Sequence, residues 1–272
     1  MSTARLKSLI IAVLFFINLF FVTNIVWSRL SFADEQSRTI ESLGAVMLSS
    51  GLSFADDASY NTTALEAYTT SQDAFAEAVI ARTILGDCEP VQSDSGQKYA
   101  GDRGTATFNP SGVFIIDLTD SYSPSDAAPE RAVRRLLKSM DVDTTEPVAT
   151  TLGNTTTVVT YCTWRGSRIF NCTVSFTFVG TELVNVTGCR PSGVAETQNG
   201  SYISFSTATL SFIRFNQAQE TPAAIISSFE PGYRMNVGAF GEGTLTPGWL
   251  IKTDTGDFFA DATSGEVLRN DA

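Results

Sequence analysis

An uncharged apolar stretch near the N-terminus limits what this chain can become more than any other feature. From Leu9 to Trp27 the sequence carries no charged residue and is rich in Leu, Ile, Val and Phe. A helix rises about 1.5 Å per residue, so a stretch of this length reaches across the roughly 30 Å hydrocarbon core of a bilayer. We therefore expect residues 9–28 to form a single transmembrane helix, with residues 1–8 as a short tail.

A cleaved signal peptide is the alternative interpretation of this stretch. Signal peptides have an apolar core of about 7–15 residues, followed by small residues at a cleavage site. Here the apolar core is longer, it ends in Trp27, and Ser-Phe-Ala at 31–33 is a poor cleavage sequence. Arg5 and Lys7 precede the stretch, which favours a cytoplasmic N-terminus. We expect an uncleaved, single-pass anchor with the rest of the chain outside the cytoplasm.

Three polar residues interrupt the apolar stretch: Asn18, Thr23 and Asn24. Within a bilayer, a polar side chain gains on average somewhat under about 1 kcal/mol by hydrogen bonding to a neighbouring helix. Asn18 and Asn24 lie about 240° apart around a helix, so the three residues do not form one stripe. For Asn24, contact with lipid headgroups is the alternative interpretation. We expect Asn18 above all, and then Thr23 and Asn24, to contact the helix of a membrane partner.

Composition argues against several classes of function. The chain has 272 residues, a formal net charge of −11 and no histidine. The acidic balance repels the phosphates of nucleic acids. The lack of histidine removes Ser-His-Asp and Cys-His nucleophile systems and His-ligated zinc. We therefore expect a protein that is not an enzyme and that holds no metal or cofactor.

The chain contains four cysteines, at positions 88, 162, 172 and 189. No two of them form the CxxC spacing of zinc or redox motifs. Cys162 and Cys172 flank the turn sequence Arg-Gly-Ser-Arg at 165–168, which could place them opposite each other across a hairpin. A disulfide between them is one interpretation, and a pair of buried free thiols is the other.

Beyond the anchor, helical and strand patterns alternate in the sequence. A juxtamembrane segment at 29–52 contains a predicted helix, and residues 53–272 form a predicted α+β domain. The domain is expected to repeat a helix-plus-antiparallel-sheet module, with modules at 53–120, 121–200 and 201–272. The helices are predicted at 34–50, 71–86, 127–140 and 222–229. The strands are predicted at 104–109, 112–118, 155–164, 168–179, 182–187, 202–215, 249–252 and 258–260.

One catalytic signature has a simple structural alternative. Asp254-Thr255-Gly256 matches the core of the aspartic protease motif, but only one copy exists. Asp and Gly also meet the backbone needs of a tight hairpin turn, and we favour that interpretation. The nearby acidic residues carry oxygen ligands of the kind that calcium prefers. Their spacing does not fit an EF-hand loop, so we expect a solvated turn instead.

Short motifs along the chain resemble those of the YycI proteins of Gram-positive bacteria and of their relative YycH. After the basic tail and anchor come an Ile-x-x-Leu helix that ends in Ser-Gly-Leu and, later, a run Ala-Arg-Thr-Ile-Leu-Gly. The final segment is similar to the ends of PepSY-like modules in that family. In order, the motifs lie at 50–52, 81–86, 231–233 (Pro-Gly-Tyr), 246–249 (Thr-Pro-Gly-Trp) and 258–267.

The resemblance implies a non-enzymatic regulator in the cell membrane of a Gram-positive type of bacterium. Such a regulator associates with a membrane sensor histidine kinase, part of a two-component system that controls cell-wall metabolism. It acts partly through its transmembrane helix, and a YycH-like co-regulator is a further expected partner. The alternative from another class is a tethered extracytoplasmic module of PepSY-like fold that binds a ligand or the wall.

Overall fold

The computed structural model of the chain describes residues 17–21, 23, 40–91, 96–124, 128–191, 193, 196–197, 200–238 and 242–270. By its internal contacts the chain divides into two units, Met1–Phe54 and Ala55–Ala272. In the first unit, residues 17–21, 23 and 40–49 are helical. Among the described residues, no helix is both long enough and apolar enough to cross a bilayer. The rest of the predicted 9–28 anchor, Asn24 included, lies outside the described residues.

The predicted juxtamembrane helix ends where the sequence places its stop. The helix runs through residues 40–49, and residues 34–39 lie outside the described part of the chain. Gly51 has φ 78°, in the left-handed region that glycine adopts without strain. The Leu52 N–H donates to the Met47 carbonyl oxygen at 2.9 Å. This bond satisfies one of the carbonyls that a helix end leaves unpaired.

The second unit is a mixed α+β fold that consists mostly of sheet, which confirms the predicted class. Its helices are α2 (Ala74–Leu85), α3 (Pro129–Ser139) and α4 (Phe205–Gln217). Its strands are β1 (Ser53–Tyr60), β2 (Tyr68–Thr70), β3 (Cys88–Val91), β4 (Gln97–Gly101), β5 (Gly104–Phe108), β6 (Val113–Tyr122), β7 (Val148–Leu152), β8 (Thr155–Trp164), β9 (Ser167–Val179), β10 (Glu182–Cys189), β11 (Glu196–Thr197), β12 (Ile225–Val237), β13 (Gly243–Thr253), β14 (Gly256–Asp261) and β15 (Val267–Arg269).

Strand β9 joins two halves of the sheet. The strand order is β11-β2-β13-β12-β9-β10-β6-β5-β4-β3, with β8 and then β7 on the other side of β9. The start of β9 pairs in parallel with β12, where Ile169 lies opposite Tyr233. Its later part pairs antiparallel with β10, and β8 runs antiparallel beside it. Because β9 belongs to both halves, it fixes how they meet.

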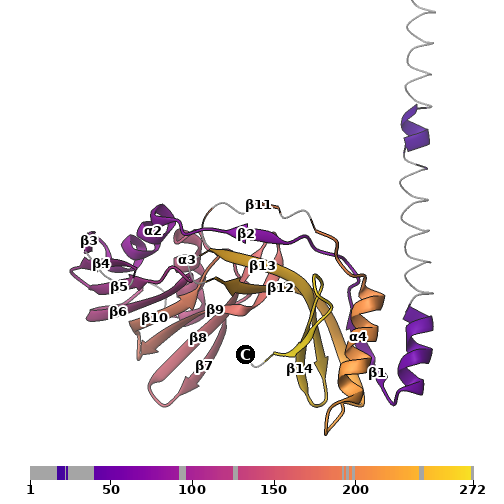
Figure 1. Cartoon of the computed structure of the whole chain (residues 1–272). Coiled ribbons are helices and arrows are strands. Elements are labelled where there is room, and N and C mark those ends of the chain that lie inside the picture. The colour runs from indigo at the N-terminus through magenta and orange to yellow at the C-terminus, as the bar shows by residue number, and fades with distance from the viewer. Residues whose placement is uncertain are drawn as a thin grey trace, which may run out of the picture. The chain divides into compact units, whose positions relative to one another are not determined.

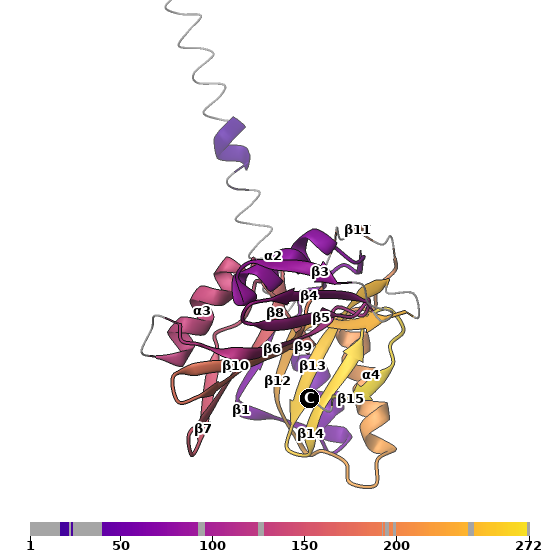
Figure 2. The same ribbon diagram turned by 90° about the vertical axis from the view of Figure 1, so that its left-hand side faces the viewer.

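The main core lies between the half-sheet around β9 and helices α2 and α3. Figure 1 shows both helices on the same face of the strands from β3 to β10. Ile80 and Ile84 of α2, Val133 of α3, and Phe114 and Phe176 of the sheet are buried in this core. Helix α4 packs instead on the other half, beside β14 and β15 (Figure 2).

Two helices and the β8–β9 hairpin are among the elements that agree with the sequence patterns. The predicted helices at 71–86 and 127–140 are α2 and α3, and the predicted strands at 155–164 and 168–179 are β8 and β9. Asp73 caps α2 by accepting hydrogen bonds from the N–H groups of Phe75 and Ala76. The two-residue turn between β8 and β9 has φ 50° at Arg165 and 81° at Gly166. Two positive values are typical of the type I′ turns that close tight hairpins.

Two predicted elements are wrong, and each has the opposite structure. Residues 202–215, predicted as a strand, contain α4, which begins after the cap residue Ser204. Residues 222–229, predicted as a helix, contain the start of β12, where Phe229 pairs with Ile251 of β13. For residues 55–70 the polar, Thr-rich sequence predicts an irregular link with short strands, and the structure has part of β1 and all of β2 there.

Candidate functional site: a three-cysteine cluster beside a small cavity

Three of the four cysteines meet where β8, β9 and β10 lie together. Cys162 belongs to β8, Cys172 to β9, and Cys189 is the last residue of β10. The Cys172 thiol donates to the Cys189 carbonyl oxygen at 2.6 Å, and the Cys162 thiol donates to the same oxygen at 3.2 Å. The side chains of Cys162 and Cys189 are both hydrogen-bond partners of the Cys172 thiol. We call these three residues the cysteine cluster.

The strand registers explain why the cluster forms. The β8–β9 ladder pairs Tyr161 with Thr173, and Cys162 and Cys172 follow directly from that pair, where a bulge interrupts the ladder. On the other side of β9, Gly188 of β10 pairs with Val174. The next residue of β10, Cys189, therefore comes level with Thr173, and its carbonyl oxygen accepts the hydrogen bond from the adjacent Cys172 thiol. In both ladders an irregularity between the turn and the cysteines shifts the register, between Tyr161 and Thr163 of β8 and between Leu183 and Asn185 of β10.

The three thiols differ in exposure, and the pKa values of two of them are shifted in opposite directions. Cys162 and Cys172 are buried, whereas Cys189 is partly exposed. Burial raises the pKa of the Cys172 thiol well above its usual value, and the hydrogen bonds to its two neighbours act in the same direction. Interaction with the Cys172 side chain lowers the pKa of Cys189, against the effect of burial. Cys189 is therefore the thiol of this pair that ionises more readily.

The predicted disulfide partners are neighbours, but no bond joins them in this structure. All four cysteines lie among the described residues, and each is a free thiol. A disulfide between Cys162 and Cys172 stays a prediction. Cys189 was not singled out from the sequence, although a meander of the predicted strands 168–179 and 182–187 would have placed it near Cys172. Cys88 lies apart on β3, where burial raises the pKa of its thiol.

A cavity of about 70 Å³ lies beside the cluster. Cys162 and Trp164 of β8 form one wall, and Arg190, which directly follows Cys189, forms another. The Trp164 indole N–H is buried and has no hydrogen-bond partner among the described residues. The lining is completed by Asp141, Val142, Asp143, Thr163 and Pro191.

The segment between α3 and β7 lines the cavity with Asp141, Val142 and Asp143. It lies along β8 like a short extra strand: Thr144 bridges to Cys162, and the Thr163 N–H donates to the Asp143 carbonyl oxygen at 2.9 Å. The buried Thr160 hydroxyl donates to the Thr145 carbonyl oxygen at 2.7 Å. These bonds keep Asp141 and Asp143 at the cavity wall.

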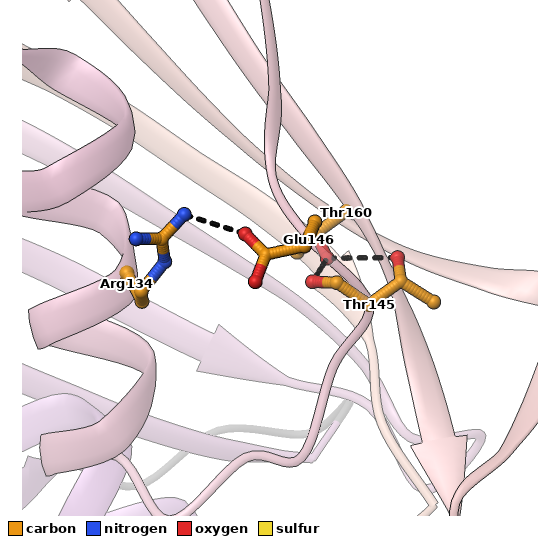
Figure 3. A network of polar contacts seen from close by, with 4 residues as sticks. All are labelled: Arg134, Thr145, Glu146 and Thr160. Atoms are coloured by element: carbon orange, nitrogen blue, oxygen red, sulfur yellow. Dashed lines mark hydrogen bonds and ion pairs between the residues drawn. The ribbon is translucent and has the colours of Figure 1, made fainter.

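Figure 3 shows how the same segment is tied to helix α3. The Arg134 side chain extends from α3 toward Glu146 and forms an ion pair with its carboxylate. Both side chains are largely exposed, and exposed ion pairs contribute little to stability. The contact between Thr145 and Thr160 ties the same segment to β8 and is part-buried, so it holds the segment more firmly than the ion pair does.

Arg190 connects the cavity with a buried carboxyl group on α2. Arg190 and Glu77 line a second, smaller space. Glu77 accepts a hydrogen bond from the Gln72 amide at 3.0 Å, but its other carboxylate oxygen is buried without a partner among the described residues. Burial raises the pKa of Glu77, and the nearby Arg190 acts in the opposite direction.

The polar residues predicted to contact a partner helix are described only in part. Asn18 and Thr23 are exposed helical residues, and Asn24 lies outside the described residues. The Thr23 hydroxyl donates to the carbonyl oxygens of Leu19 at 2.7 Å and Phe20 at 3.0 Å. Thr23 therefore satisfies its hydroxyl within its own helix, and contact of the three residues with a partner stays a prediction.

The acidic residues near the C-terminus stabilise turns. Asp254, in the turn between β13 and β14, accepts hydrogen bonds from the N–H groups of Ala224 and Ile225. Asp261 accepts from the N–H groups of Thr263 and Ser264. Within the part of the chain that the structure describes, no group of three or more Cys, Asp or Glu side chains could hold a metal ion.

Comparison with known proteins finds only distant structural likenesses. No protein-family model matches the sequence, and no curated protein matches it. An uncharacterised protein from Eubacterium rectale is similar with a TM-score of 0.49 at 10% identity, over 79% of this chain and 91% of that one. The Bacillus megaterium YpeB C-terminal domain is similar with a TM-score of 0.37 at 11% identity, over 75% of this chain and 100% of that one. At these TM-scores neither likeness supports a conclusion about function.

Proposed function

We propose that the chain is a membrane-anchored regulator without catalytic activity, which contacts a sensor histidine kinase that controls cell-wall metabolism. The observation that carries the proposal is the uncharged stretch from Leu9 to Trp27, which precedes a body with its own core. In this proposal residues 9–28 anchor the protein. Residues 53–272 form PepSY-like modules outside the cytoplasm, where a YycH-like protein is a further partner.

The body offers a broad surface for such contacts on the sheet face opposite α2 and α3. One row of cross-strand neighbours crosses eight strands there, and most of its side chains are β-branched. Val91, Ile115 and Val148 in this row are 44%, 43% and 66% exposed, so the row presents apolar side chains to solvent at three places. We call this row the open face; in order it is Val148, Val159, Ser175, Thr187, Ile115, Thr107, Lys98 and Val91.

The mechanism we propose is a population shift. A ligand or subunit moves a two-state protein only by the difference in its affinity for the two states. An anchor that packs better against one state of the kinase helices, with the open face contacting the kinase outside the membrane, would favour that state. This mechanism needs contacts but no catalytic group, in agreement with the lack of histidine.

A tethered ligand- or wall-binding module is the second candidate. It is favoured by an open hollow of about 910 Å³ at the edge of the sheet, beside β3 and β4. Its lining contains both charge signs, from Arg82, Asp87, Glu89 and Asp102. In this alternative the anchor only tethers the body.

An exchange of the anchor separates the two candidates. Residues 9–28 are replaced by an unrelated transmembrane segment of equal length, and membrane insertion of the variant is verified. If the chain is a regulator that acts through its anchor, the exchange should abolish co-purification of the kinase and change the kinase output. Unchanged co-purification and output would favour the tether.

A single substitution refines this test. Asn18→Leu removes the amide that we expect to contact a partner helix, and we predict weaker co-purification of the kinase. Ile17→Leu at the preceding position is the matched control and should have no effect. If both variants behave like the unaltered protein, Asn18 makes no such contact.

A further inference from the structure

We propose that Cys162, Cys172 and Cys189 form a thiol–disulfide exchange site, in which Cys172 forms a disulfide with either of its two neighbours. The proposal concerns the cysteine cluster alone and is independent of the proposed regulatory function.

The position of Cys172 makes it the common partner. Its strand, β9, lies between the strands of the other two cysteines, and its thiol has both of their side chains as hydrogen-bond partners. The Cys162 and Cys172 thiols also converge on one acceptor, the Cys189 carbonyl oxygen, at 3.2 and 2.6 Å. Three thiols this close form at most one disulfide among themselves, so one thiol always stays reduced.

Exposure assigns the first step to Cys189. Cys172 is fully buried, and Cys162 borders a cavity of about 70 Å³, which is too small for a peptide disulfide. Cys189 is partly exposed, and interaction with the Cys172 side chain lowers its pKa. The attacking species in disulfide exchange is the thiolate, so Cys189 is the thiol that meets an external oxidant.

The oxidant in this proposal is a low-molecular-weight disulfide such as glutathione disulfide. The Cys189 thiolate attacks one of its sulfur atoms, which forms a mixed disulfide and releases one glutathione thiolate. Cys172, on losing its proton, then attacks the Cys189 sulfur and expels the second glutathione. Two cysteine thiols have then lost two electrons and two protons, and one glutathione disulfide has been reduced to two glutathione thiols.

The third thiol allows the new bond to move. Attack of the Cys162 thiolate on the Cys172 sulfur forms the Cys162–Cys172 disulfide and returns Cys189 as a thiol, without net oxidation. The two states tie different strand pairs, β9 to β10 or β8 to β9. They also differ at the cavity wall, where Cys162 is either a free thiol or part of the disulfide.

The test is disulfide mapping by mass spectrometry on the full-length chain in detergent, after treatment with glutathione disulfide and blocking of free thiols. Cys162→Ala should give only the Cys172–Cys189 bond, and Cys189→Ala should give the Cys162–Cys172 bond at a lower rate. Cys172→Ala should lose all disulfides within the cluster and accumulate glutathione on Cys189. Cys88→Ala is the matched control and should behave like the unaltered chain.

Two results would overturn the proposal. One is a Cys162–Cys189 disulfide in Cys172→Ala at the yield of the unaltered chain, which would remove the central role of Cys172. The other is the absence of any cluster disulfide in the unaltered chain under oxidation. Since the second result comes from the unaltered protein, the test does not depend on the folding of a variant.

Discussion

At the scale of single residues, the most unusual group is the Glu77 carboxyl on α2. It is 4% exposed, and one of its oxygens is buried without a partner among the described residues. Burial disfavours the ionised form, which raises the pKa of Glu77. The native state therefore binds this proton more tightly than the unfolded state does.

This difference predicts a specific pH dependence of stability. A raised native pKa means that the contribution of Glu77 is fully present below the pKa of the unfolded chain, about 4.3. The contribution is lost as the pH rises through the native pKa. Glu77→Gln keeps the hydrogen bond from Gln72 but cannot ionise, so it should lose less stability than the unaltered chain between pH 4 and pH 7.

Urea unfolding of the full-length chain at both pH values measures the effect. Glu220→Gln, which alters a carboxylate exposed to solvent, is the control and should leave the pH dependence unchanged. Equal pH dependence of Glu77→Gln and the unaltered chain would show that Glu77 ionises without penalty.

The Asn171 side chain joins two strands that are far apart in the sequence. Its amide accepts from the Met235 N–H and donates to the Met235 carbonyl oxygen, both at 2.8 Å. The side chain thus continues the junction of β9 and β12 where the backbone pairing ends. Asn171→Ala leaves two part-buried backbone groups without this partner and should reduce the unfolding free energy by about 1–3 kcal/mol.

The conservative variant isolates the two bonds. Asn171→Asp keeps the acceptor and loses the donor, so its unfolding free energy should lie between those of Asn171→Ala and the unaltered chain. Denaturant titration checks the order of the three proteins. A stability for Asn171→Ala equal to that of the unaltered chain would show that the junction does not depend on this amide.

At the scale of elements, α2 illustrates a helix whose boundaries are set by local chemistry. The Asp73 side chain accepts from two N–H groups of the first turn, and Gly86 ends the helix with φ 80°. Asp73→Ala should destabilise the unit by about 0.5–2 kcal/mol, as the loss of a capping side chain typically does. Asp73→Ser retains a capping oxygen and should restore most of the stability in the same denaturant titration; failure of the serine to do so would contradict the capping role.

Local signals of this kind were readable in the sequence, and so were the β8–β9 hairpin and the C-terminal hairpin. Helix α4 was missed because its apolar residues also fit a partial alternation. Phe205, Ala208, Phe212 and Ile213 are buried at helical spacing, and Ser204 caps the helix. The start of β12 was missed for a different reason. Its conformation depends on pairing with β13, far along the chain, which no local pattern contains.

The same distinction applies to the cysteine cluster. The closeness of Cys162 and Cys172 was expected from the hairpin, but it also depends on the bulge that shifts the β8–β9 register between Tyr161 and Thr163. Cys189 joins them only because β10 lies on the other side of β9, which requires the strand order. Arg190 and Glu77 likewise come together from distant parts of the sequence.

At the scale of the whole molecule, an apolar N-terminal stretch precedes a sheet-rich body. The body has its own core, an open face of mostly β-branched side chains and a cluster of three thiols. The proposed regulation depends on all of this remaining attached to the membrane through residues 9–28. Retention of the anchor in the mature protein is therefore the central claim.

The most direct test is intact-mass analysis of the protein from fractionated cells, with alkaline extraction of the membranes. We predict that the whole chain, residues 1–272, stays in the extracted membranes and that an external protease releases the body from intact protoplasts. Recovery from the culture medium of a chain that begins near residue 30 would contradict the account, because it would identify the apolar stretch as a cleaved signal peptide.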